Sequence, residues 1–84
     1  MRPTEIKIKF FATHREAVGH REEVLTTNSP STLKELVKTL EQRYPALKQL
    51  RRSTIYCVNQ RVVRGDVKLR EGDEVALFPP VGGG

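Results

Sequence analysis

The sequence predicts an α+β fold in which a mixed sheet of four to five strands packs on one main helix. Three patterns support this prediction. Charged and apolar residues alternate near the start, apolar residues recur at helical spacing in the middle, and a short apolar run bounded by turn residues lies near the end. A chain of 84 residues suffices for one core, so we expect a single domain over 1–84, with 79–84 as an extended tail.

The first two strands are expected to form a hairpin. In residues 5–10, the isoleucines and Phe10 fall on one face and the lysines on the other, as in a half-buried strand. The polar stretch 13–19 is expected to be a long loop, and a second short strand follows at 23–27.

The main helix is predicted to begin at Thr32 and to stop by about Arg43. Thr32 and Glu35 fit a capping box, and Pro45 disfavours helical geometry in the residue before it. Its buried stripe is expected to comprise Leu33, Leu36, Val37 and Leu40. Its solvent face is expected to comprise Lys34, Lys38, Glu41 and Gln42.

Three further strands are predicted in the second half of the chain. A third strand at 55–58 turns at Asn59-Gln60 into a short fourth strand at 61–63. Another turn at Gly72-Asp73 precedes a final strand at 74–78. This ββαββ order allows the first and last strands to pair in parallel at the centre of the sheet. Such an arrangement is the β-grasp architecture.

The charge of the chain is positive but dispersed. The formal net charge is +5, and lysines and arginines are scattered through every segment, with only Arg51-Arg52 adjacent. This distribution favours a solvated basic surface, or a basic face that docks on acidic protein partners, over nucleic-acid binding. We expect Arg51-Arg52 itself to be a solvated pair.

Other residues predict no site of their own. Cys57 lies in an apolar strand and is expected to be a small core residue, while His14 and His20 are expected to be surface residues of a polar loop. One cysteine and two histidines give no metal-ligand spacing and no internal disulfide, so we expect no metal. No apolar run is long enough for a signal peptide or a membrane span, so a cytoplasmic location is expected.

The candidate functional segment is the end of the chain, Phe78-Pro79-Pro80-Val81-Gly82-Gly83-Gly84. The prolines cannot donate to a strand ladder and stiffen the root of the tail. Three glycines add nothing to a core, yet they form a thin strand that fits a channel too narrow for any Cβ. From Val81, this strand reaches roughly 10 Å at about 3.3–3.6 Å per residue. A frayed end or a linker is the alternative interpretation of the glycines.

A terminal carboxylate gains a defined chemistry once it is activated. After adenylation by ATP it accepts sulfur to become a thiocarboxylate, or an amine to become an amide. The same tail therefore suits a sulfur carrier or a protein modifier.

Several motifs together resemble the small subunits of molybdopterin synthase, which are ubiquitin-like sulfur carriers of the molybdopterin and thiamine type. The matching residues are Phe11-Ala12, Arg15-Glu16, Gly19, Thr32, Leu33, Leu36, Val58-Asn59 and, most specifically, the run from Leu69 to Gly84 with Gly-Asp-Glu-Val-Ala and Phe-Pro-Pro-Val. Gly82, which stands before the final Gly-Gly pair, is a mild departure from the family pattern.

The resemblance implies a function. An E1-like enzyme would adenylate Gly84 with ATP and magnesium, and a sulfur donor such as a cysteine desulfurase system would convert it to a thiocarboxylate. The tail would then insert into the large subunit and give its sulfur to a cyclic pterin precursor. Gly82 and Gly83 would thread the channel, and Phe78, Pro79, Pro80 and Val81 would dock at its entrance. The chain would bind no cofactor and would not be an enzyme on its own.

Other functions stay open as alternatives. A ubiquitin-like modifier, or a carrier for thiamine synthesis or tRNA thiolation, would also need Gly84 at the end of the chain. A binding module without tail chemistry, such as a β-grasp RNA-binding domain, would tolerate loss of the tail.

Overall fold

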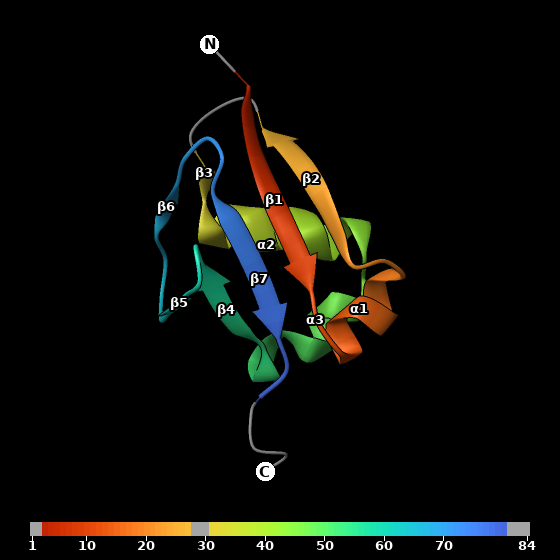
Figure 1. The fold of residues 1–84 in the computed structure, drawn as a ribbon. Coiled ribbons are helices and arrows are strands. Elements are labelled where there is room, and N and C mark those ends of the chain that lie inside the picture. Colours follow the sequence, from red (N-terminus) through yellow and green to blue (C-terminus); the bar gives the residue numbers. More distant parts are fainter. Residues whose placement is uncertain (1–2, 28–30, 81–84) are drawn as a thin grey trace.

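The computed structural model describes residues 3–27 and 31–80 (Figure 1). In chain order the elements are β1 Thr4–Phe10, α1 Thr13–Val18, β2 Glu22–Thr27, β3 Ser31–Thr32, α2 Leu33–Arg43, α3 Ala46–Leu50, the 3-10 helix η1 Arg51–Ser53, β4 Ile55–Val58, β5 Arg61–Val63, β6 Lys68–Leu69 and β7 Glu74–Phe78. The α+β class is confirmed.

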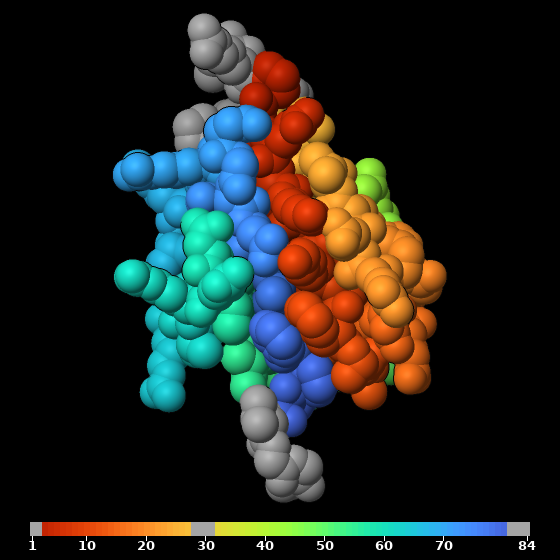
Figure 2. All heavy atoms as spheres, in the orientation of Figure 1, coloured from red at the N-terminus to blue at the C-terminus, as the bar shows by residue number. Residues whose placement is uncertain are grey.

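The main sheet has five strands in the order β2-β1-β7-β4-β5. At its centre β1 and β7 run in parallel, with Lys7 beside Glu74 and Phe10 beside Leu77. The other pairs in this sheet are antiparallel, including the hairpins β1–β2 and β4–β5. α2 passes behind the sheet in Figure 1, whereas none of the described helices covers the face turned to the reader in Figure 2. The β-grasp prediction is confirmed.

The core lies between α2 and the covered face of the sheet. The alternation of buried and outward-facing residues predicted for β1 is confirmed, because Ile6 and Ile8 are fully buried and Phe10 is nearly so. Further buried side chains from the other elements complete the cluster: Leu25, Leu33, Leu36, Leu40, Leu47, Leu69, Val75 and Leu77.

The capping prediction for α2 is confirmed. The Thr32 hydroxyl accepts a hydrogen bond from the Glu35 backbone N–H at 3.2 Å, and the Glu35 carboxylate accepts one from the Thr32 N–H at 3.1 Å. The helix ends at Arg43, before Pro45, as the sequence predicts.

One prediction for α2 is wrong. Glu41 was expected on the solvent face, but it is only 3% exposed. Arg51 of η1 explains this burial, because its guanidinium makes two hydrogen bonds to the Glu41 carboxylate, one of them 2.8 Å from Nε to Oε2. The pKa of Arg51 is raised by these bonds and by the charge of Glu41. Arg51 is therefore paired rather than merely solvated.

The expected loop at 13–19 is also wrong, since most of it forms α1. Six residues are too few for a clear hydrophobic period, so the sequence pattern does not reveal this helix. It ends at Gly19, whose φ of 97° is left-handed and costs glycine little. The short elements α3, η1, β3 and β6 were likewise not predicted.

None of the helices in the described parts, 3–27 and 31–80, has the length and apolar character needed to cross a bilayer.

Candidate functional site

The described part of the candidate segment leaves the middle of the sheet. β7 is hydrogen-bonded to neighbours on both sides until its last residue, where Ile55 lies opposite Phe78 and the Phe11 N–H donates to the Leu77 carbonyl at 3.2 Å. Pro79 is half-buried and Pro80 is exposed, and neither belongs to a strand. The strand ladder therefore ends at Phe78, before the prolines, as predicted.

The chemistry predicted for the tail falls on residues that the structure does not describe. Val81, Gly82, Gly83 and Gly84 lie outside the described residues. Their threading, docking and sulfur-carrying roles stay predictions, and the geometry at their root is what the structure adds.

That root is built around a stack of two aromatic rings. The rings of Phe11 and Phe78 lie 4.4 Å apart between centroids and only 7° from parallel. Phe11 is 39% exposed and Phe78 is half-buried. A large aromatic surface thus remains open to solvent where the C-terminal segment begins.

The stack belongs to a wider apolar area on the uncovered face of the sheet. Because side chains alternate along a strand, Val75 and Leu77 point into the core and their neighbours in β7 point outward. The register then places the outward residues of β4 beside them. We call this area the outer patch. It consists of the exposed Phe11, the half-buried Ile55, Cys57 and Phe78, and Ala76, which is only 8% exposed.

Charged pairs flank the outer patch on β1. The Lys7 ammonium lies 3.1 Å from the Glu22 carboxylate, and the Lys9 ammonium lies 3.5 Å from that of Glu74. Both pairs are partly solvent-exposed, so each contributes little to stability. An apolar centre with a polar border is the usual anatomy of a protein interface.

Within 3–27 and 31–80, no three histidine, cysteine or acidic side chains gather in a way that could hold a metal ion. Cys57 is a half-buried free thiol on β4. The arrangement suits presentation of the C-terminal segment to another protein.

The prediction that His14 is a surface residue is wrong. It is 1% exposed, and its Nε2 lies 2.7 Å from the Thr54 hydroxyl. Burial lowers the pKa of His14 and outweighs the opposing effect of the Phe11 backbone. His14 is buried because it belongs to α1, which folds against the rest of the domain, and not to an open loop.

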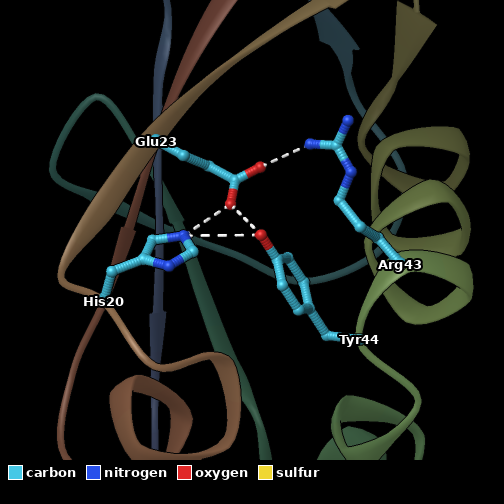
Figure 3. A network of polar contacts seen from close by, with 4 residues as sticks. All are labelled: His20, Glu23, Arg43 and Tyr44. Atoms are coloured by element: carbon cyan, nitrogen blue, oxygen red, sulfur yellow. Dashed lines mark hydrogen bonds and ion pairs between the residues drawn. The ribbon is translucent and has the colours of Figure 1, made fainter.

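His20 is exposed as predicted, but it takes part in a polar network between β2 and the end of α2 (Figure 3). The Glu23 carboxylate lies 2.7 Å from His20 Nε2 and 2.8 Å from Arg43 Nη1, and it accepts a hydrogen bond from the Tyr44 hydroxyl. Burial would raise the pKa of Glu23, but these hydrogen bonds together lower it. The network joins a sheet edge to the helix.

Sequence reasoning missed Phe11 as a site residue, although a signal was present. If the first and last strands pair in parallel, Phe10 beside Leu77 puts Phe11 next to Phe78. The predicted parallel pairing was this signal, but the register that places Phe11 next to Phe78 comes from the structure.

Comparison with known proteins gives a consistent result. The family model described as "ThiS family" matches residues 8–84. The chain is 38% identical over 81 residues to the molybdopterin synthase sulfur carrier subunit of Escherichia coli, with 94% of this chain and 99% of that protein covered. It is 34% identical over 83 residues to the human protein of the same name, with 95% of this chain and 94% of that protein covered.

Solved structures agree with the sequence relatives. The putative molybdopterin converting factor subunit 1 of Pyrococcus furiosus superposes with a TM-score of 0.84 at 28% identity, over 93% of this chain and 99% of that one. The small archaeal modifier protein 1 of Methanosarcina acetivorans gives a TM-score of 0.81 at 27% identity over the whole of both chains. These matches span nearly the entire fold, including the strand that leads to the C-terminus. The chain therefore belongs to the ThiS family, and within it to the group of molybdopterin synthase sulfur carrier subunits.

Proposed function

We propose that this chain is the sulfur carrier subunit of a molybdopterin synthase and that Gly84 carries the sulfur. The observation that supports this most is the exit of the chain from the sheet. β1 pairs with β7 as far as Leu77 and β4 as far as Phe78, and the two prolines that follow belong to no strand. In the proposal, the folded domain presents the residues after Pro80 to the partner proteins.

The proposed chemistry has three steps on Gly84. Its carboxylate attacks the α-phosphate of ATP on an E1-like activating enzyme, so that pyrophosphate leaves and an acyl adenylate forms. A persulfide sulfur, supplied by a donor such as a cysteine desulfurase system, then attacks the acyl carbon, and AMP leaves. Reductive cleavage of the resulting acyl disulfide by a thiol leaves the thiocarboxylate.

The acceptor is a cyclic pterin precursor held by the large subunit. In the proposal, Gly82 and Gly83 pass through a channel too narrow for side chains, while Val81 and the two prolines fill its entrance. The outer patch then docks on the large subunit, because it joins exposed aromatic surface to the root of the tail. This chain binds no cofactor, and the ATP and magnesium belong to the activating enzyme.

The test is the intact mass of the protein after incubation with ATP, a sulfur source and the activating enzyme from the same cells. A gain that corresponds to one oxygen replaced by sulfur is expected. The matched control lacks Gly83 and Gly84 and should show no gain. An unchanged mass in the full chain would contradict the proposal. Addition of precursor and large subunit then assays pterin sulfuration directly.

A second candidate is a ubiquitin-like modifier, which is favoured by the structural similarity to small archaeal modifier protein 1. A modifier uses the same adenylate, but a lysine amine attacks it instead of sulfur. The same mass experiment separates the two functions. Isopeptide adducts without any thiocarboxylate would support the modifier.

A further inference from the structure

A groove of about 590 Å³ opens between α2 and the β4–β5 hairpin. Val37 of α2 lines one wall, and Tyr56 and Val63 line the other. These two strand residues lie opposite each other in register and point away from the outer patch, since Cys57 and Val62 alternate with them. The groove and the outer patch are thus on opposite faces of the sheet.

The strand beside the groove has an unpaired edge. β5 is the last strand of the main sheet, and in the described residues no strand pairs with its outer side. Val58 and Arg61 close a two-residue hairpin, in which Asn59 and Gln60 both have positive φ, and such a pair exchanges both backbone hydrogen bonds. The alternating ladder then leaves the N–H and C=O of Val62 directed outward.

The charge at the groove is also unbalanced. Of its two acidic residues, Glu41 is paired with Arg51, whereas Asp66 keeps its negative charge, because its 2.8 Å hydrogen bond comes from the neutral Lys34 backbone N–H. Lys34 and Lys38 line the groove one helical turn apart, and neither forms an ion pair with the residues that the structure describes. The lining thus has three cationic side chains, Lys34, Lys38 and Arg51, against the two carboxylates, which leaves one net positive charge on the side of the two lysines.

At the opposite edge of the sheet, the space between strand and helix is not open. There the gap between β2 and α2 is bridged by the network of His20, Glu23, Arg43 and Tyr44 (Figure 3). Side chains of this protein thus occupy the β2 side, while the β5 side remains open.

We propose that the groove binds an extended acidic segment of a partner protein. The segment adds to β5 as a further strand, with main-chain hydrogen bonds to Val62. Its central apolar side chains cover Tyr56 and Val63, and its carboxylates lie near Lys34 and Lys38. The proposal does not rest on the tail chemistry, and because the two faces are opposite, the segment binds while the outer patch is occupied.

The probe is the acetylated and amidated heptapeptide Asp-Glu-Val-Ile-Val-Glu-Asp, titrated into the ¹⁵N-labelled full chain and followed by amide chemical shifts. We expect saturable shifts in β5 and along α2. The same peptide with lysine at each acidic position should bind at least tenfold more weakly. Equal binding of both peptides, shifts confined to β2 or the outer patch, or no saturable shifts would overturn the proposal.

Two variants test the two interactions separately. Lys34→Glu with Lys38→Glu should weaken acidic-peptide binding at least tenfold, whereas the charge-matched double substitution of the exposed Arg15 and Arg21 by glutamate should change it less than twofold. If the control substitution weakens binding as much as the groove substitution, net charge alone is responsible and the site is wrong.

Val62→Pro removes the free N–H of β5 and should abolish the shifts, while Val62→Thr retains it and should bind normally. The thermal midpoint of each variant shows whether it is folded. Normal peptide binding by folded Val62→Pro would exclude strand addition.

Discussion

The contact between Phe11 and Phe78 is expected to serve both the stability of the domain and its docking. Phe11→Ala removes a ring that is 39% exposed, so only part of the 1.5–3 kcal/mol for a fully buried phenylalanine is lost. With the stacking contribution of about 0.5–1.5 kcal/mol, the expected loss is about 1–3 kcal/mol. For a domain of this size, each kcal/mol lowers the thermal midpoint by about 4–8 °C.

A double-mutant cycle isolates the stack itself. Urea unfolding of the wild type, Phe11→Ala, Phe78→Ala and the double variant should give a coupling energy of about 0.5–1.5 kcal/mol, because the rings lie 4.4 Å apart and nearly parallel. Additive effects, with coupling below about 0.3 kcal/mol, would refute the view that the rings stabilise each other.

The same variants test the outer patch. If the stack is a central anchor for the large subunit, Phe11→Ala should cost at least about 2 kcal/mol of binding free energy, or about 30-fold in Kd by calorimetry. Val24→Ala is the control, since Val24 is 57% exposed on β2 and lies outside the patch. Unchanged affinity of folded Phe11→Ala would refute the docking role.

Three further predictions concern the polar groups of the fold. Glu23→Gln should lower stability by about 1–3 kcal/mol at neutral pH. Because the pKa of Glu23 in the folded state lies below the unfolded value of 4.5, the difference in thermal midpoint from the wild type should shrink as the pH falls below about 4.5. A difference that stays constant with pH would contradict this. The pKa of His14 is lowered from 6.5, so as the pH decreases the unfolded state takes up the proton first. Stability should therefore decrease as the pH drops below 6.5, by at most about 1.4 kcal/mol per pH unit. In urea titrations, His14→Gln should lack this pH-dependent loss of stability, and a pH profile identical to that of the wild type would refute the prediction. Arg51→Met should lower the thermal midpoint more than Arg52→Met, because only Arg51 pairs with the buried carboxylate of Glu41, and equal effects would mean that the pair does not stabilise the fold.

Local patterns in the sequence were sufficient for the main architecture. Alternation in residues 5–10 and the apolar spacing after Thr32 each predict one element, because the side-chain periods of strands and helices differ. Pro45 and the capping box set the ends of α2 for equally local reasons. The parallel pairing of β1 and β7 follows once the order of elements is known.

Contacts between distant segments decided what the sequence left open. Glu41 is polar and lies on an apparently exposed helix face, yet Arg51 of η1 lets it be buried. His14 is buried because α1 folds against the rest of the domain, and the two-residue pair β3–β6 exists only where 31–32 and 68–69 meet. Such short elements depend on tertiary packing rather than on their own propensity.

The candidate site, too, was predicted in part from local sequence and depends in part on tertiary contacts. The sequence by itself predicted the chemistry, since Pro79, Pro80 and the glycines after them favour a thin segment beyond the last strand, and this chemistry stays a prediction. Only the tertiary structure decided what surrounds its root. Phe11 and Phe78 are far apart in the chain, and the parallel pairing of their strands makes them one aromatic surface. A terminal motif can be recognised in a few consecutive residues, whereas a docking surface requires side chains from several strands in register.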